Sequence, residues 1–331
     1  MLRIFTPTRN NTPPPLENTD QPSTCTINFA NGDKLECEWI SNKASGQGTK
    51  TFANGDILEC DGWNDGKAQG KGKRTDHDGA VYEGEFKNDA ANGYGVMTYA
   101  SGDVYSGEWI EDDFWGRGKY TFEDGDEYEG EFKDGKADGK GLYRYANGNV
   151  LECTWVVGKA YGKGVLTYAN GDVLECEWKD GKENSEGIKK FANKDVLKST
   201  WKDGKVNGSG VYEFANGQVL ECDWEDDEPC ADGKRVKKFA NGDKFEGEYK
   251  AGKAVNGVMT FANGDVLKCE AWADEGEANG KGVKTFANGD TIEGEWKNGE
   301  LHGEAVYKSA DGTVWLMKPA SQSYGVSKSA S

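Results

Sequence analysis

The sequence predicts an all-β fold: an elongated, single-layer, antiparallel β-hairpin repeat solenoid of about 12 hairpins. An aromatic-Ala-Asn-Gly-Asp turn, as at residues 168–172, recurs with a period of about 23 residues. Nearly every copy is followed by a run in which apolar and acidic residues alternate, as at residues 174–178. The chain has 47 glycines and only 35% hydrophobic residues. This composition cannot build one deep core, whereas stacked repeats need contact only with their neighbours.

Composition divides the chain into three parts. Residues 1–23 are rich in Pro, Asn and Thr and are expected to form a disordered leader. Residues 24–318 carry the repeats, and residues 319–331 are expected to be a flexible polar tail. No apolar run long enough for a secretory signal or a membrane span is visible at the start of the sequence or later.

Each unit of the array is predicted to be one hairpin. The Asn-Gly step at residues 170–171 lies between two alternating runs, and both residue types tolerate the positive φ of a tight hairpin turn. The Asp-Gly step at residues 180–181 supplies a second turn, which leads to the next unit. The first turn leaves two registers open. A two-residue loop pairs Tyr168 with Val173, whereas a three-residue loop with a left-handed glycine pairs Tyr168 with Asp172.

Glycines and one lysine mark special backbone positions. Gly162 and Gly164 are interpreted as a place where the chain changes direction and a side chain would be crowded. Lys194 replaces the turn glycine in its unit, so a non-glycine residue is expected at positive φ. That unit is therefore predicted to be the weakest of the array.

Strand alternation gives the array two different faces. Leu174, Cys176 and Trp178 point one way, and Glu175 and Glu177 point the other. The same split recurs in the other units, which predicts an aromatic-lined face and an acidic face.

Three stretches closely resemble a known repeat: residues 82–87, 128–136 and 292–303. Each has the form Tyr or Ile, Glu, Gly, Glu, an aromatic residue and Lys, and the two longer ones continue into an Asp-Gly or Asn-Gly turn. They resemble the MORN (membrane occupation and recognition nexus) repeat, whose pattern is Tyr-x-Gly-x-Trp, Asn-Gly and His-Gly-x-Gly. The resemblance covers roughly residues 29–318. It implies an extended β-hairpin solenoid used for protein assembly and membrane-associated tethering, often as a dimer.

The chain departs from that pattern in one systematic way. The family's Tyr-x-Gly becomes Leu-x-Cys at Leu35/Cys37, Leu58/Cys60, Leu151/Cys153, Leu174/Cys176, Leu220/Cys222 and Leu267/Cys269. Units between residues 82 and 132 keep the family form.

The repeated cysteines are predicted to be small buried hydrophobic residues in a reducing compartment. Equivalent positions in consecutive hairpins are about 10 Å apart, too far for a disulfide bond or for shared zinc ligation. Cys25 and Cys230 lie off the repeated position, and no bond between them is expected. Asp-rich turns such as residues 124–126 lack the calcium-loop pattern of the EF-hand and are explained by turn chemistry. No metal and no cofactor are therefore predicted.

The sequence offers no sign of catalysis. The chain has two histidines, His77 and His302, and neither lies in a nucleophile or metal-ligand motif. A repeated glutamate is a surface pattern rather than an acid/base pair. The net charge of −18 weighs against nucleic acid as the main partner, because binding to phosphate needs a basic face. The chain is predicted not to be an enzyme.

Two sets of residues are candidates for contact with a partner. Most aromatic residues of the repeats are expected to be core, but an exposed subset would anchor a protein partner. The candidates are Trp115, Phe114, Trp109, Trp155 and Trp178, with Trp115 placed in an exposed loop outside the repeat pattern. Basic turns would contact lipid headgroups through Lys71, Lys73, Arg74, Lys234, Arg235, Lys237 and Lys238.

The leading hypothesis is a non-enzymatic scaffold that binds protein through its aromatic or its acidic face. Self-association as a homodimer through an end or an edge is also expected. The second hypothesis is a phospholipid-tethering module, and the third is a carbohydrate-binding surface built on Trp115. The predicted location is cytoplasmic, at the periphery of a membrane or a cytoskeletal structure.

Overall fold

Strands joined by tight turns make up nearly all of the part of the chain that the structure describes. The computed structural model describes residues 3–5, 23–40, 43–273, 277–320 and 323–328, with side chains within residues 24–40, 43–273 and 277–318. The chain divides into two units, Met1–Ala169 and Asn170–Ser331. Across the described ranges, no helix is long and apolar enough to cross a membrane.

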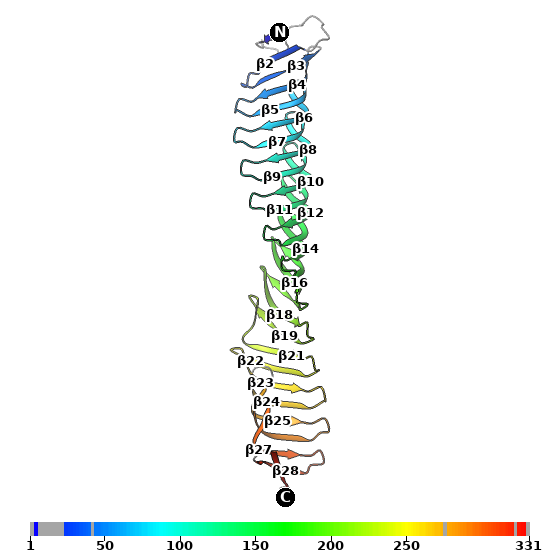
Figure 1. Ribbon diagram of the computed structural model, residues 1–331, viewed down its shortest axis with the longest axis vertical. Coiled ribbons are helices and arrows are strands. Elements are labelled where there is room, and N and C mark those ends of the chain that lie inside the picture. The colour runs from blue at the N-terminus through cyan, green and yellow to red at the C-terminus, as the bar shows by residue number, and fades with distance from the viewer. Residues whose placement is uncertain (1–2, 6–22, 41–42, 274–276, 321–322, 329–331) are drawn as a thin grey trace. The chain divides into compact units, whose positions relative to one another are not determined.

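In unit 1 each strand from β2 to β13 pairs antiparallel with the strand that follows it in the chain (Figure 1). The first strand pairs parallel with β2. The strands are β1 (Arg3–Phe5), β2 (Ser23–Asn28), β3 (Lys34–Ile40), β4 (Lys43–Thr51), β5 (Ile57–Asn64), β6 (Lys67–Thr75), β7 (Val81–Lys87), β8 (Ala90–Thr98), β9 (Val104–Ile110), β10 (Asp113–Thr121), β11 (Glu127–Lys133), β12 (Lys136–Arg144), β13 (Val150–Val156) and β14 (Lys159–Thr167).

Unit 2 has the same hairpin order, with one short extra strand, β20, beside β19. Its strands are β15 (Val173–Lys179), β16 (Lys182–Lys190), β17 (Val196–Lys202), β18 (Lys205–Glu213), β19 (Val219–Glu225), β20 (Glu228–Pro229), β21 (Gly233–Lys238), β22 (Lys244–Lys250), β23 (Lys253–Thr260), β24 (Val266–Ala273), β25 (Glu277–Thr285), β26 (Thr291–Lys297), β27 (Glu300–Lys308), β28 (Val314–Ala320) and β29 (Ser323–Lys328). The predicted fold class, an all-β array of antiparallel hairpins, is confirmed.

Two kinds of turn alternate along each unit. In the first, the N–H of Phe29 donates to the carbonyl of Asp33 (2.9 Å), and the N–H of Gly32 donates to the carbonyl of Phe29 (3.1 Å). Gly32 has a φ of 95°. This is the three-residue loop with a left-handed glycine, so the register left open by the sequence is the one that pairs the aromatic residue with Asp. In the second, Asp65 and Gly66 both have positive φ, as a two-residue hairpin turn requires.

A bulge interrupts the pairing where glycine pairs occur in the sequence. Between β7 and β8 the register shifts after Gly84, and Gly93 has a φ of 111°. A Cβ atom on Gly95 would lie 2.3 Å from the Tyr82 hydroxyl oxygen. The equivalent pair at Gly162 and Gly164 also lies beside a bulge, which bends the strand, but a Cβ on Gly162 would meet no neighbouring atom, so the expected crowding is not found there.

The core follows from the alternation that the sequence predicts. Along β15, Leu174, Cys176 and Trp178 are buried, whereas Glu175 and Glu177 are exposed. Farther along unit 2, residues on both sides of the bulges join one cluster of buried side chains: Phe245, Met259, Leu267, Cys269, Trp272, Ala278 and Trp296. Each hairpin repeat thus buries one face of its strands and leaves the acidic face exposed to solvent.

Asparagine and aspartate hold successive turns together. Oδ1 of Asp33 accepts the backbone N–H of Ala53 in the next turn (3.0 Å), and Asp126 does the same for Ala146 (2.7 Å). The hydroxyl of Tyr307 and the N–H of Ala310 donate to Asp290, and both bonds hold the pKa of that carboxyl below its usual value. The turn aspartates that resemble calcium ligands are thus already engaged by the next repeat.

The two ends differ in part from their predicted states. Arg3–Phe5 forms a strand within the expected leader, and Ser323–Lys328 forms a strand within the expected tail. Both segments have a neighbouring strand to pair with, which composition alone does not reveal. Residues 6–22 and 329–331 lie outside the described residues, so the domain boundaries at 24 and 318 stay a prediction.

Candidate partner-binding groove

Three of the predicted aromatic anchors belong to the core. Trp109, Trp155 and Trp178 retain 3%, 8% and 4% of their exposure. The indole N–H of Trp109 donates to the carbonyl of Gly95 (3.1 Å), and that of Trp155 to the carbonyl of Gly141 (3.3 Å). The prediction that these three residues anchor a partner is wrong, because the bent strands close over the face on which they lie.

Phe114 and Trp115 lie on strand β10 rather than in a loop. Phe114 is opposite Trp109, at the position that Ala91 and Ala137 occupy in the neighbouring hairpins. Its ring stacks on Tyr105 with 3.8 Å between ring centroids, so it packs against the core although it is itself half-buried. Trp115 is opposite Glu108 on the outward face and is also half-buried. The loop prediction is wrong, and of the five aromatic candidates only Trp115 faces outward, since Phe114 lies on the same side of its strand as the buried Trp109 opposite it.

The two arginines of the predicted lipid-contact set do not face outward. Strand alternation turns Arg74 inward, where it pairs with Asp76 (3.0 Å) and Asp112 (3.2 Å). Arg235 donates to the carbonyl of Cys230 (2.7 Å), and its guanidinium lies over the ring of Tyr249. Both arginines make contacts within the chain, and their assignment to lipid contact stays a prediction.

The lysines of the same set have neighbours of their own. Lys73 pairs with Glu83 (2.9 Å), and Lys238 pairs with Glu221 (2.6 Å). Lys237 lies over the Phe239 ring. Lys71 is opposite Glu85, and Lys234 is opposite Glu248. A basic sequence run therefore does not become one basic surface.

The outward face of unit 2 carries an apolar row that the sequence analysis missed. Val236, Val258, Val283 and Val306 lie on β21, β23, β25 and β27 and remain partly or fully exposed. Charged residues stand between them in register: Glu246, Lys268 and Glu293. Alternate strands are about 10 Å apart, so the row presents a methyl-rich contact at about that interval.

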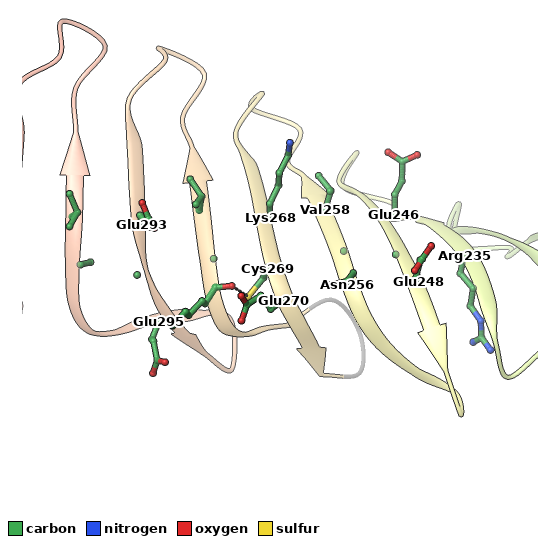
Figure 2. A pocket seen from close by; sticks show the side chains of 18 of the residues that line it. Arg235, Glu246, Glu248, Asn256, Val258, Lys268, Cys269, Glu270, Glu293 and Glu295 are labelled. Atoms are coloured by element: carbon green, nitrogen blue, oxygen red, sulfur yellow. Dashed lines mark hydrogen bonds between the residues drawn. The ribbon is translucent and has the colours of Figure 1, made fainter.

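This row forms the floor of a groove of about 1020 Å³. Figure 2 shows its labelled side chains coming from successive strands of unit 2, with Val258 and Lys268 on neighbouring strands. Six glutamates line it, against the basic residues Lys234, Arg235, Lys268 and Lys281: Glu246, Glu248, Glu270, Glu293, Glu295 and Glu304. The lining is therefore aliphatic at its floor and acidic on balance.

The signal for this row was present in the sequence. Valine follows the second residue of the Gly-x-Gly position at Gly257-Val258, Gly282-Val283 and Ala305-Val306 in the second half, and also at Gly95-Val96 and Gly164-Val165 in the first. Thr or Lys follows it at Gly48-Thr49 and Gly72-Lys73. Aligning the units would have shown the apolar row, but the bulge decides which face it is on.

The groove contains no recognisable reaction centre. The thiol of Cys269 donates to the backbone carbonyl of Asn279 (2.9 Å) and is buried beneath the floor. Among the described residues, no group of three or more His, Cys, Asp or Glu side chains is placed to hold a metal ion. What the groove offers is contact area and negative charge.

Comparison with protein families identifies the repeat. The MORN repeat model matches residues 38–57, 62–81, 82–104, 105–127, 128–150, 154–173, 177–196, 198–219, 245–266, 274–291 and 293–314. The chain belongs to the MORN repeat family. The matched ranges include the tyrosine-bearing hairpins of unit 1 and part of the groove lining of unit 2, with Val258, Val283 and Val306 inside them and Val236 outside.

No curated protein matches the chain. Among solved structures, the TCP domain of SAS-4 (dCPAP) of Drosophila melanogaster, in complex with a proline-rich motif of Ana2, is 18% identical with a TM-score of 0.32. That match covers 50% of this chain and 85% of the other. The TCP10 domain of Danio rerio CPAP is 12% identical with a TM-score of 0.20 and covers 92% of this chain and 99% of the other.

Proposed function

We propose that this MORN-repeat chain is a non-enzymatic scaffold that binds a protein partner in the groove of unit 2. The observation that carries the proposal is the valine row between glutamates, which is open to solvent although the opposite face of the same strands is buried. Apolar area surrounded by polar residues is typical of a protein-binding site.

The charge of the groove selects the kind of segment that fits. Within the described residues, no ion pair is formed by Glu248, Glu270, Glu293 or Glu295. Lys234 and Lys281 lie opposite Glu248 and Glu295, and six glutamates against four basic residues leave the groove acidic on balance. A segment with apolar side chains on one side and Lys or Arg beside them would fill the floor and pair with these carboxylates. An α-helix advances about 10.5 Å in seven residues, close to the spacing of the valines, so apolar residues at heptad spacing match the row.

Binding of a defined peptide tests this proposal. The probe is a labelled amphipathic peptide with Leu at heptad spacing and Lys between the leucines. The control peptide has the same sequence with Glu in place of each Lys. Fluorescence anisotropy with the full chain should show binding of the Lys peptide only, weakening as salt is added. Equal binding of both peptides, or of neither, would contradict the proposal.

A matched pair of variants locates the contact. Glu293→Lys in the groove should weaken binding by about two- to tenfold, the range expected for an exposed charge pair. Glu129→Lys changes the same repeat position in unit 1, is not among the residues that line the groove, and should leave binding unchanged. If Glu129→Lys weakens binding as much, the site is not the groove of unit 2.

Other predictions from the sequence keep their own tests. Lipid contact stays a prediction, and the lysines of that set that remain exposed are Lys71, Lys73, Lys234 and Lys238. Flotation with anionic vesicles would reveal such contact. Glycan binding rests on Trp115, and a glycan array compared with Trp115→Ala addresses it. Homodimerisation and a cytoplasmic location stay predictions.

A further inference from the structure

Two cysteines of the first hairpin face each other directly. Strands β2 and β3 pair antiparallel, and their register places Cys25 opposite Cys37. At two other repeats the cysteine faces glycine on both sides: Cys60 is opposite Gly48 and Gly72, and Cys153 is opposite Gly141 and Gly164. In the first hairpin a cysteine therefore stands where the repeat otherwise has the second glycine of its Gly-x-Gly pair.

The distance between the two backbones suits a disulfide bond. Directly opposite residues of an antiparallel pair have Cα atoms about 4.5–5.5 Å apart, within the range of about 4.4–6.8 Å found across disulfides. The separation of about 10 Å that excludes bonds between equivalent cysteines does not apply, because Cys25 and Cys37 lie on adjacent strands of one hairpin.

The side chains are in contact and are not equivalent. Both residues are buried, with 4% exposure each, and their thiols hydrogen-bond to one another. The hydrogen bond from Cys37 lowers the pKa of Cys25. The pKa of Cys37 is raised by its bond to Cys25 and by burial. Cys25 is thus the better nucleophile, with Cys37 beside it as the resolving thiol.

We propose that Cys25 and Cys37 form a reversible intrachain disulfide when the protein meets a peroxide. The Cys25 thiolate attacks one peroxide oxygen, the O–O bond breaks, and the departing hydroxide takes a proton to become water. Cys25 is then a sulfenic acid. The sulfur of Cys37 attacks the sulfur of Cys25, the S–O bond breaks, and the thiol proton of Cys37 passes to the leaving hydroxide, which departs as the second water. Both sulfurs are oxidised, the peroxide is reduced to two waters, and a thiol reductant restores the dithiol.

The bond would fasten one edge of the array. Strand β2 carries β1 on its other side, with Arg3 in register with Cys25. A covalent link from Cys25 to Cys37 therefore ties the strand that holds β1 to the rest of unit 1.

Peptide mapping of the full chain tests the proposal. Trypsin cleaves after Arg9, Lys34 and Lys43, so Cys25 and Cys37 fall in separate peptides, residues 10–34 and 35–43. The native protein is treated with hydrogen peroxide, its remaining thiols are alkylated, and the digest is analysed without reductant. The expected product joins the two peptides and has lost two hydrogen atoms, and dithiothreitol separates it. Backbone amides of β2 should then exchange on the order of tenfold more slowly than in the reduced protein.

Two variants keep the test specific. Cys25→Gly restores the glycine of the other hairpins and should fold, yet give no linked peptide. Cys60→Ser removes a repeated cysteine that faces only glycine and should leave the linked peptide unchanged. If native wild-type protein gives no linked peptide, or if Cys37 joins Cys60 as readily as Cys25, the proposal is wrong.

Discussion

In unit 1 the space over the paired glycines of each hairpin is filled in two ways. In the tyrosine repeats, which begin at Tyr82, Tyr105 and Tyr128, the ring lies over two glycines of the hairpin, and its hydroxyl donates to a backbone carbonyl of the same strand (3.0–3.1 Å). In the cysteine repeats, which begin at Leu35, Leu58 and Leu151, the smaller leucine leaves that space, and a thiol fills it. The thiol of Cys60 donates to the carbonyl of Gln69 (3.3 Å), in place of the tyrosine hydroxyl.

The replacement of tyrosine by leucine and cysteine affects the next repeat along the chain. Trp109 and Trp155 follow tyrosine repeats, and each indole N–H reaches a glycine carbonyl. Trp63 follows the Cys37 repeat, and within the described structure its buried indole N–H has no hydrogen-bond partner. Leucine and cysteine therefore replace the tyrosine volume but lose a hydrogen bond in the neighbour, and an orphaned buried donor costs about 1–3 kcal/mol. The comparison predicts that tyrosine repeats are the more stable kind.

The largest expected loss of stability comes from removing the tyrosine ring of a tyrosine repeat. Tyr105 is fully buried and in contact with Phe114, Trp109 and Phe132. Tyr105→Ala should lower stability by about 3–5 kcal/mol through lost burial and a cavity. Leu58→Ala, in a cysteine repeat, is the matched change and should cost less. Urea unfolding followed by circular dichroism compares the two, and a larger loss for Leu58→Ala would reverse the ranking.

Converting one repeat into the other kind tests whether the two residues act as a pair. Gly130→Cys alone should destabilise strongly, because its Cβ would lie 2.6 Å from the Tyr128 hydroxyl oxygen. Adding Tyr128→Leu should recover part of the loss, with a coupling energy of about 0.5–3 kcal/mol in a double-mutant cycle. Simple additivity would show that the two positions are independent. Faster exchange of the Trp155 indole N–H in the double variant would confirm the effect on the next repeat.

High pH should weaken the tyrosine repeats. Burial raises the pKa of Tyr82 to about 12, whereas an unfolded tyrosine has a pKa of about 10. The folded state therefore holds this proton more tightly than the unfolded state. Its contribution to stability is complete below pH of about 10 and is lost as the pH rises toward about 12. Unfolding midpoints across this range should fall less steeply for Tyr82→Phe than for wild type, and parallel curves would argue against the assignment.

The smallest expected effect concerns a turn and is independent of how the core is filled. Lys194 has a φ of 76° in a turn that otherwise carries glycine. Lys194→Gly should raise stability by about 1 kcal/mol, because a side chain at positive φ is strained. Gly217→Lys makes the reverse change in the next turn, where no neighbouring atom would crowd a Cβ, and should lower stability by a similar amount. Thermal unfolding measures both, and equal stability of Lys194→Gly and wild type would exclude backbone strain at this turn.

The parts of the fold that sequence reasoning reached are those set by local chemistry. The Asn-Gly turns, the two-residue periodicity and the glycine pairs each act within one hairpin, so they could be read directly from residues such as Asn170 and Gly171. What it missed depends on contacts between strands. Alternation puts Trp109, Trp155 and Trp178 on one face of their strands and Arg74 and Lys73 on opposite faces, but which face is buried appears only in the folded array. The valine row of the groove was missed for the same reason, because its role appears only when strands stand side by side.

The hydrogen bonds between successive turns give each unit a direction. Oδ1 of Asp243 holds the backbone N–H of Ala262, which lies 19 residues later, and the equivalent bonds in both units run from the later turn to the earlier one. Removing the carboxylate at Asp243 would therefore free an amide in the following repeat as well as disturb its own turn. Substitution of a turn aspartate should therefore speed hydrogen exchange of an amide in the following repeat. Where one turn amide exchanges unusually fast, the substitution responsible is expected one repeat earlier in the chain.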